Sequence, residues 1–231
     1  MKAALISTHA TRPVYSRKVF EAVANQCRGM VHIAGVEKNC FEPGLRGIIT
    51  EFSGAFEKTI ILTNEGVAHC NNNFANCLNA FMETDCEAFI YMEDDTLLSK
   101  NAVRFLLDQI EAHGDSEEFS HVTPAASEDG HAPTEHNLSV AAATGGFASL
   151  WGVSGNRLTA WRLIESTPVL DEGMRERARD DHSIVWDVAY KKVRESEGWF
   201  AVVPLVSRMQ NIGVEGGLHS CGHRWETWEG Q

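Results

Sequence analysis

The sequence predicts an α/β fold built on a parallel sheet. Short apolar segments alternate with amphipathic stretches, and in the first half four strand-like segments are interleaved with three helix-like ones. Apolar residues make up 43% of the 231 residues, enough for a sizeable core. No repeat, low-complexity segment or convincing linker divides the chain, so we expect a single domain over residues 1–231.

The first half carries the regular alternation. Strands are expected at residues 3–8, 30–34, 59–63 and 88–92. Helices are expected at Pro13 to Cys27, at Phe74 to Met82 with asparagines 71–73 as caps, and at Val103 to Ile110 with Ser99 as cap. Residues 36–58, which contain several glycines and a proline, are expected to be mostly loop.

The second half is less regular. Strands are expected at residues 120–123, 147–153 and 199–203, and helices at 156–165 and 184–193. The tail from Ser207 is rich in Gly, His and Trp.

Charge and composition limit the classes of partner. The formal net charge is −12, so the protein has no general attraction to nucleic acid or anionic membrane. No stretch reaches the ~18 apolar residues of a membrane span. The N-terminal apolar run is too short for a signal peptide, and the six cysteines form no CxxC pair. We therefore expect a cytoplasmic protein, or one in the host cytoplasm if a virus encodes it, with reduced thiols.

The most informative motif is Glu93-Asp94-Asp95, directly after the apolar segment 88–92. Three adjacent carboxylates at the end of a buried strand repel one another and resist desolvation. A divalent cation removes that conflict, and hard oxygen ligands suit Mg²⁺ or Mn²⁺ that also holds substrate phosphates. The alternative is a solvated acidic turn.

Other polar residues are expected beside this motif, because the carboxyl ends of parallel strands share one edge of a sheet. Thr8 and Arg12 follow the first strand, and Asn64 follows the third. Arg12 can meet a phosphate or a carboxylate of the site. The alternative for Arg12 is a solvated loop arginine.

The second half adds further candidates. Asp180-Asp181 precedes a predicted helix, where it is either a helix cap or a base that takes a proton from an acceptor hydroxyl. Gly145-Gly146 either lets a ligand approach the backbone or is a plain turn. His219-x-Cys221-x-His223 matches no common zinc spacing, so a single histidine folding back onto the acidic site is favoured. The sequence contains no P-loop, dinucleotide fingerprint or nucleophile elbow.

Taken in order, four segments resemble glycosyltransferases of the GT-A fold, particularly N-acetylglucosaminyltransferase I and family 2-like enzymes. Each motif alone is weak, and the ordered set spans nearly the whole chain. The segments are Thr11-Arg12-Pro13, Tyr91 to Asp95 as a DxD-type metal motif, Gly145-Gly146 before an aromatic segment, and Asp180-Asp181 followed by Ser207-Arg208 and His219-Ser220.

The resemblance implies a Rossmann-like nucleotide-sugar-binding sheet with a smaller acceptor-side subregion. Residues 1–112 would form the nucleotide-sugar and metal half, and residues 113–231 the acceptor half with a closing C-terminal loop. It also implies Mn²⁺ or Mg²⁺, a nucleoside-diphosphate sugar such as a UDP-sugar, and inversion at the anomeric carbon.

The same resemblance assigns roles to individual residues. Asp95 would bind the metal, and Asp94 and Glu93 would hold the ribose, the sugar or a metal-bound water. Asp180 or Asp181 would be the base. The remaining assignments are Thr8, Arg12 and Asn64 at the nucleotide, Gly145 and Gly146 on the acceptor side, and Arg208 and His219 in the loop over the diphosphate, with His219 as a further metal ligand.

Two other functions stay open. A sugar nucleotidyltransferase shares the sheet and the metal, but it usually has a glycine-rich loop after the first strand, and Ala10-Thr11-Arg12-Pro13 has no glycine. A non-catalytic nucleotide-sugar-binding module is the other alternative, and the Asp180-Asp181 pair argues modestly against it.

The acceptor is open between a glycan and a hydroxymethylated base in viral DNA. A DNA acceptor needs a local basic patch and a flipped base. The basic residues available for such a patch, which otherwise form a solvated helix face, are Arg175, Arg177, Arg179, Lys191, Lys192 and Arg194.

Overall fold

The computed structural model describes most of the first half of the chain and the principal elements of the second. The described residues are 1–9, 12–37, 43–64, 70–126, 140–143, 152–171, 174, 184–204 and 206–212.

An eight-stranded mixed sheet forms the centre of this part of the chain, in the order β3-β2-β1-β4-β8-β6-β9-β7. The strands are β1 (Ala3–His9), β2 (Val31–Glu37), β3 (Lys58–Asn64), β4 (Ala88–Glu93), β6 (Phe119–Val122), β7 (Val140–Ala143), β8 (Ser154–Asn156) and β9 (Phe200–Pro204). The first four are parallel, as the sequence predicts, and β8 continues the sheet antiparallel to β4. Strands from both halves of the chain thus share one sheet.

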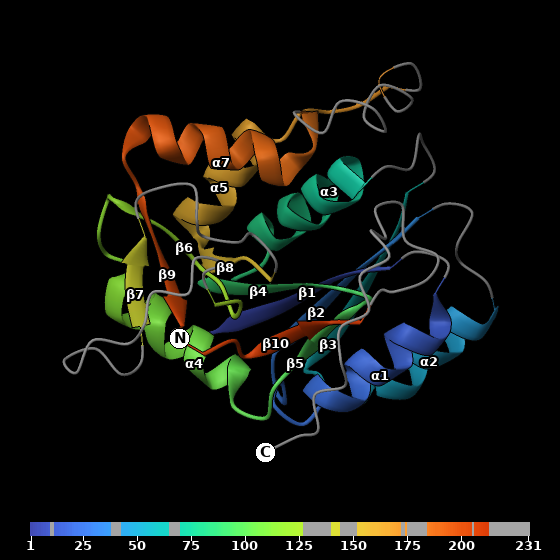
Figure 1. Cartoon of the computed structure of the whole chain (residues 1–231). Coiled ribbons are helices and arrows are strands. Elements are labelled where there is room, and N and C mark those ends of the chain that lie inside the picture. The colour runs from blue at the N-terminus through green and yellow to red at the C-terminus, as the bar shows by residue number, and fades with distance from the viewer. Residues whose placement is uncertain are drawn as a thin grey trace.

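Helices cover both faces of the sheet (Figure 1). One face carries α1 (Pro13–Val23), α2 (Pro43–Ser53) and α4 (Ala102–His113), and the other carries α3 (Cys70–Met82), α5 (Arg157–Ser166) and α7 (Trp186–Glu197). Side chains alternate along β1 and β4, so Leu5 and Ile90 pack toward α1 while Ile6 and Tyr91 pack toward α3. Two apolar cores result, one on each side of the sheet.

Residues 36–58 are not mostly loop, because helix α2 lies within them. Leu45, Ile48 and Ile49 are buried at helical spacing against the sheet. Burial of this stripe outweighs the low helix propensity of Gly44 and Gly47.

The predicted caps of α3 and α4 are also wrong. Helix α3 begins at Cys70, so the three asparagines lie inside it and their amides bind other segments. The N-cap of α4 is Asn101 rather than Ser99, and it makes no side-chain capping bond. Of the strand expected at residues 147–153, residues 147–151 lie outside the described residues and 152–153 are not in a strand; strand β8 begins at Ser154.

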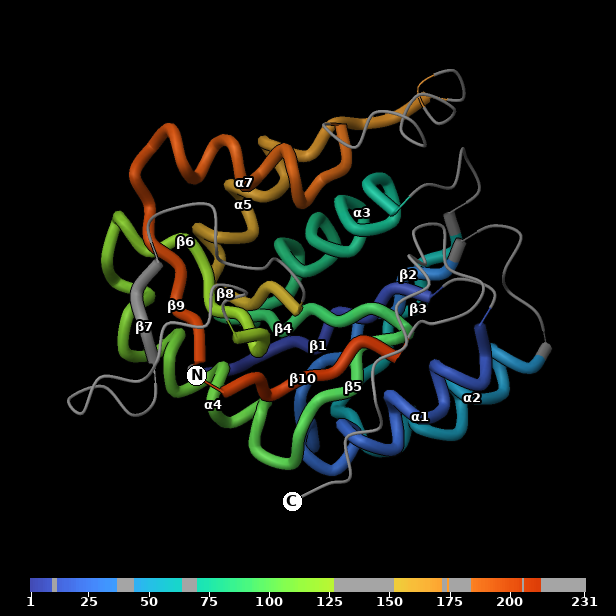
Figure 2. Tube along the Cα trace, viewed as in Figure 1, coloured from blue at the N-terminus to red at the C-terminus, as the bar shows by residue number. Residues whose placement is uncertain are grey.

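A second sheet pairs two distant short strands, which Figure 2 shows side by side. Strand β5 (Thr96–Leu98) follows the acidic motif, and β10 (Met209–Asn211) lies antiparallel to it. Sequence periodicity did not reveal either strand, because three residues are too few to show a period.

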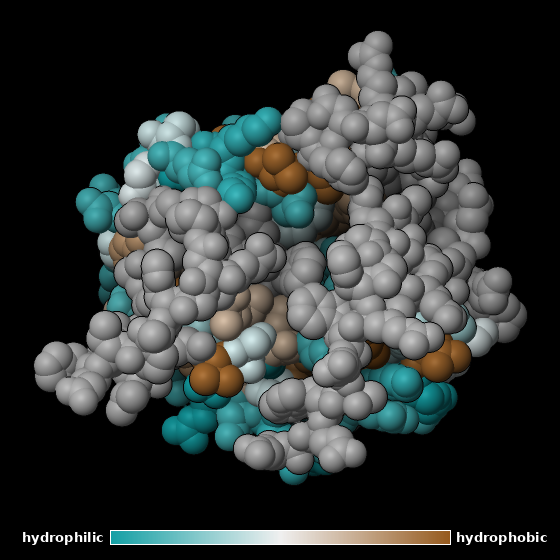
Figure 3. All heavy atoms as spheres, viewed as in Figure 1, coloured by the Kyte–Doolittle hydropathy of each residue, from teal (hydrophilic) through white to brown (hydrophobic). Residues whose placement is uncertain are grey.

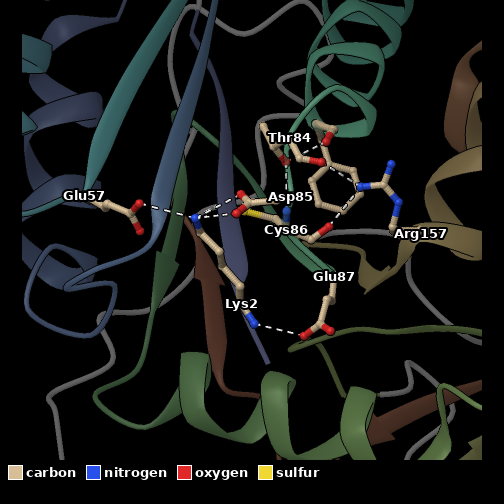
Figure 4. Close-up of polar contacts among 8 residues, drawn as sticks. Lys2, Glu57, Thr84, Asp85, Cys86, Glu87 and Arg157 are labelled. Atoms are coloured by element: carbon tan, nitrogen blue, oxygen red, sulfur yellow. Dashed lines mark hydrogen bonds and ion pairs between the residues drawn. The ribbon is translucent and has the colours of Figure 1, made fainter.

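The edge opposite the acidic motif is held by polar contacts (Figure 4). Nζ of Lys2 contacts Glu57 and Asp85. The Arg157 guanidinium donates to the carbonyl oxygens of Met82, the last residue of α3, and of Thr84 and Cys86 just beyond it. A cation at a helix C-terminus satisfies its free carbonyls and complements its dipole.

The exposed side of α7 is of mixed charge. Figure 3 shows hydrophilic side chains gathered around this helix, and its exposed residues include Lys192, Glu195 and Glu197. Arg194 is fully buried, so it does not belong to a basic surface patch, which corrects the sequence-based expectation. Burial lowers its pKa. Among the described helices, none is both long and apolar enough to cross a membrane.

Candidate functional site

The acidic motif lies at the carboxyl end of β4, the strand at which the parallel part of the sheet meets the antiparallel strand β8. Glu93 is the last residue of β4, and Thr8 on β1 is its register partner. Asp94 and Asp95 form the turn between β4 and β5, and both are buried, with 2% and 7% of their surface exposed. The motif is therefore not a solvated acidic turn.

Arg12 binds both aspartates. One terminal nitrogen donates to Oδ1 of Asp94, and the other lies 3.0 Å from Oδ2 of Asp95. Burial lowers the pKa of Arg12, but the charges of Asp94 and Asp95 outweigh this effect and raise the pKa overall. The sequence left open whether Arg12 meets a phosphate or a carboxylate of the site. In the structure it binds carboxylates.

Asp95 retains a ligand position. Its Oδ1 is buried and has no hydrogen-bond partner among the described residues. Such an oxygen fits a divalent cation, and Mg²⁺ is commonly held by one or two carboxylates together with substrate phosphates. No set of three or more His, Cys, Asp or Glu side chains forms a metal site within the described ranges. Further ligands would come from a substrate or from residues outside those ranges, such as His219.

Glu93 ends a chain of hydrogen bonds that runs across the sheet. Oγ1 of Thr8 lies 2.9 Å from Oη of Tyr91, which donates to Oε1 of Glu93 at 3.2 Å. Burial raises the pKa of Glu93 to about 8, with smaller contributions from the charges of Asp95, Asp94 and Asp187. Tyr91 packs in the core on the α3 and α7 side of the sheet, so its hydrogen bond places Glu93 on that side, while Arg12 binds the other two acids.

Asp187 is a residue that sequence reasoning missed. It lies in the first turn of α7 and is close enough to Glu93 to raise the pKa of that residue. Trp186, its neighbour, packs on Tyr91 with ring centroids 5.6 Å apart. An acid at the start of a predicted helix could have marked Asp187 as a candidate. Its proximity to Glu93 could not be predicted, because the two residues are far apart along the chain.

Asn71 of α3 fixes the start of α7. Its amide nitrogen donates to the carbonyl oxygens of Pro168 and Ile184, each at 2.9 Å, and its Oδ1 accepts from the backbone N–H of Trp186. Asn72 adds two bonds to the backbone of Leu170. The two segments that flank residues 172–183 are thus bound to α3 beside Tyr91.

Several predicted site residues lie outside the described residues, namely Asp180, Asp181, Gly145, Gly146 and His219. The backbone of Asn64 ends β3 in register with Glu37, but its side chain is not described. Helix α7 begins at Trp186 with Val185 as N-cap and no side-chain capping bond. Asp180 and Asp181, either as a helix cap or as a base, stay a prediction, because they lie outside the described residues.

The C-terminal strand β10 brings the tail to the motif but leaves Arg208 away from it. The backbone N–H of Ile212 donates to the carbonyl oxygen of Asp95, so the chain beyond Ile212 starts beside the acids. The Arg208 carbonyl accepts from the backbone N–H of Ser99 at the other end of the β5–β10 pair, and the Arg208 guanidinium stacks on Phe105, 4.5 Å from the ring centroid. The structure does not bring Arg208 to the carboxylates.

Comparison with known proteins identifies the fold. No family model and no curated protein matches the sequence. S. aureus TarS 1–349 in complex with UDP-GlcNAc matches with a TM-score of 0.62 and 12% identity, over 97% of this chain and 62% of that chain. CMP:2-keto-3-deoxy-manno-octonic acid synthetase complexed with CTP matches with a TM-score of 0.52 and 12% identity, over 88% of this chain and 89% of that one.

A TarS 1–349 structure in complex with UDP gives a TM-score of 0.53 at 10% identity and is covered to 57%. This chain therefore spans less than two thirds of the length of the TarS chains. TarS is a GT-A glycosyltransferase, and the chain has the Rossmann-like α/β arrangement of the GT-A fold that the sequence predicts. Identities of 10–12% establish the fold alone.

Proposed function

We propose that this protein is a metal-dependent glycosyltransferase that moves a sugar from a nucleoside-diphosphate sugar to an acceptor hydroxyl with inversion. One observation carries the proposal. In a GT-A fold, three acids lie at and just after the end of strand β4, and Asp95 keeps a buried carboxylate oxygen without a hydrogen-bond partner among the described residues. The match to TarS in complex with UDP-GlcNAc supports a nucleotide sugar, with UDP-sugars first, as the substrate.

Each described residue has a role in this proposal. Asp95 would hold Mn²⁺ or Mg²⁺, which neutralises negative charge on the departing diphosphate. Thr8, Tyr91 and Glu93 would orient hydroxyl groups of the donor through their hydrogen-bonded chain. Arg12, with its planar fork of donors, would bind phosphate oxygens.

The base of the reaction is assigned to Asp180 or Asp181. An inverting displacement needs a proton acceptor on the face of the sugar opposite the leaving group. Ile184, three residues after Asp181, is bound to Asn71 beside Tyr91. Three residues span at most about 10 Å, which is the longest stretch of chain that can separate Asp181 from Ile184.

A sugar nucleotidyltransferase is the second candidate. The synthetase complexed with CTP is close to this chain in length, since 89% of it is covered. The absence of glycine from residues 9–13 counts against a loop that grips a triphosphate. A non-catalytic nucleotide-sugar-binding module is the third.

The acceptor is proposed to be a glycan in preference to DNA. With Arg194 buried and Glu195 and Glu197 exposed on α7, two of the six candidate basic residues, Lys191 and Lys192, remain on the described part of that surface. A hydroxymethylated DNA base requires phosphate contacts that this mixed face supports poorly. Binding to modified DNA at low salt that is lost in the Arg175/Arg177/Arg179 triple alanine variant would reverse this preference.

A product assay separates the three functions. The protein is incubated with nucleotide sugars, and separately with nucleoside triphosphates and sugar phosphates, with Mn²⁺ or with EDTA. A glycosyltransferase releases nucleoside diphosphate, a nucleotidyltransferase releases pyrophosphate, and a binding module releases neither. We expect Mn²⁺-dependent release of nucleoside diphosphate, and pyrophosphate release would contradict the proposal.

A further inference from the structure

Arg12 and a divalent cation require the same carboxylates. Arg12 spans Asp94 and Asp95 with its two terminal nitrogens, and the three side chains are only 13%, 3% and 10% exposed. A metal ion on Asp95 would place a second positive centre beside the guanidinium in a poorly solvated site, where like charges repel strongly. Arg12 and the metal therefore cannot both bind the aspartates at full strength.

Arg12 is placed so that its side chain can change partners. It is the N-cap residue of α1, directly before Pro13, and the backbone N–H of Ser16 donates to its carbonyl oxygen. Its backbone is thus held by the helix, while its guanidinium is held by the two aspartates and lies 5.6 Å from the Tyr15 ring centroid. Nε of Arg12 is buried without a hydrogen-bond partner among the described residues, so the present arrangement leaves one donor unused.

A diphosphate would offer Arg12 a better partner once the metal is bound. Arginine binds phosphate oxygens through two parallel hydrogen bonds, and its charge would offset that of the diphosphate. The metal would then satisfy Asp95, including the buried Oδ1 that the guanidinium does not reach.

We infer that Arg12 couples metal binding to diphosphate binding: it neutralises Asp94 and Asp95 until a divalent cation replaces it, and it then binds the diphosphate. The inference rests on the proposed function, because it assumes that a divalent cation and a nucleoside diphosphate share this site. It concerns the order and the cooperativity of their binding.

The consequence is a positive coupling between the two ligands. Metal that binds alone must separate Arg12 from the aspartates without giving it a new partner. When the diphosphate is present, the displaced guanidinium gains one. Each ligand therefore tightens the binding of the other by the same factor, as linkage requires.

The test measures Mn²⁺ affinity with and without UDP, by electron paramagnetic resonance of free Mn²⁺. The variants are Arg12→Gln, Arg12→Lys and the control Arg17→Gln, which removes an exposed arginine of the same helix that pairs with Glu51. We expect Arg12→Gln to bind Mn²⁺ alone about tenfold more tightly than the wild type. In the wild type, UDP should tighten Mn²⁺ binding by a factor in the usual range of about 5- to 150-fold, and Arg12→Gln should lose this effect. Arg12→Lys should be intermediate, because lysine lacks the fork, and Arg17→Gln should match the wild type.

Three results would overturn the inference. Arg12→Gln could bind Mn²⁺ alone no more tightly than the wild type, its coupling factor could be unchanged, or Mn²⁺ could bind none of the proteins. Circular dichroism checks that each variant is folded. If Arg12→Gln does not fold, Arg12→Lys is used for the test instead. The affinity measurement needs no turnover. If the protein transfers sugar but the coupling between Mn²⁺ and UDP is unchanged in Arg12→Gln, only the role of Arg12 is refuted. If the coupling is found but no sugar is transferred, only the proposed function is refuted.

Discussion

At the residue scale, the repulsion within the acidic motif is relieved by a partner far away in the sequence. Asp94 and Asp95 bind an arginine 82 and 83 residues earlier, and Glu93 binds Tyr91 instead. The three adjacent acids therefore lie in two environments: Asp94 and Asp95 beside the Arg12 guanidinium, and Glu93 beside the Tyr91 hydroxyl. The motif itself and its position after a strand were readable from the sequence, whereas the choice of Arg12 as partner of both aspartates required the fold.

Gly35 allows helix α3 to approach strand β2. A Cβ atom at this position would overlap Oδ1 of Asn73 and Sγ of Cys77, both on α3. We expect Gly35→Ala to lower the free energy of unfolding by about 1–3 kcal/mol, the usual cost of forcing extra volume into a packed core. Urea denaturation measures this.

Gly54→Ala is the matched control for that change, because a Cβ atom there meets open space. Its effect should stay within about 0.5 kcal/mol. Equal effects of the two substitutions would show that α3 does not pack on Gly35 as described.

At the element scale, the site is held together by bonds from one helix to the segments around it. The asparagines of α3 read as helix caps in the sequence, because asparagine is common at that position. In the structure they are inside the helix, and Asn71 instead binds the backbone at Pro168, Ile184 and Trp186. The sequence pattern predicted helix α3 and its apolar face, but it did not predict that the asparagines of this helix bind the backbone of neighbouring segments.

Removing the Asn71 side chain should loosen the start of α7. Asn71→Ala leaves two carbonyl groups and one N–H without their partner, and each buried group left unpaired costs about 1–3 kcal/mol. With partial recovery by water, we expect a total loss of about 3 kcal/mol in the free energy of unfolding. Hydrogen exchange should also be faster at Trp186.

Asn79→Ala, an exposed position of the same helix, provides the control and should be nearly neutral. If the two alanine variants are equally stable, the role of Asn71 in holding these segments is refuted.

At the scale of the whole molecule, the sequence predicts the layout of the parallel half better than the rest. Strands β1 to β4 and helices α1, α3 and α4 appear where periodicity places them, because each buries a long apolar stripe. Helix α2 was missed because its glycines obscured the buried stripe at Leu45, Ile48 and Ile49. Strands β5 and β10 are too short to leave a pattern, and their pairing joins residues more than 100 positions apart.

The core under α1 contains a neutral network of histidines that links stability to pH. Oγ of Ser7 lies 2.8 Å from Nε2 of both His9 and His32, and Nδ1 of His9 contacts Ser16. Burial lowers the pKa of each histidine to about 3. The unfolded chain takes up these protons near pH 6.5 while the folded protein does not, so stability is fully present above pH 6.5 and falls as the pH decreases toward 3.

Each such histidine should contribute a slope of about 1.4 kcal/mol per pH unit within that window. We expect the free energy of unfolding of His32→Gln to fall less steeply than that of the wild type by this amount between about pH 6 and pH 4. Urea denaturation at several pH values measures both slopes. Identical slopes in the two proteins would mean that His32 is not held neutral in the folded state.

The central claim is that the acids at the end of β4 hold the metal that a nucleotide-sugar reaction needs. The most direct measurement is the rate of Mn²⁺-dependent release of nucleoside diphosphate from a nucleotide sugar by the wild type, Asp95→Asn and the control Asp115→Asn, an exposed acid after α4. We expect Asp95→Asn to lose about a hundredfold or more, because a catalytic metal supplies several kcal/mol of charge stabilisation. Asp115→Asn should keep the wild-type rate. Release that is unchanged by Asp95→Asn, or equal with EDTA in place of Mn²⁺, would contradict the account.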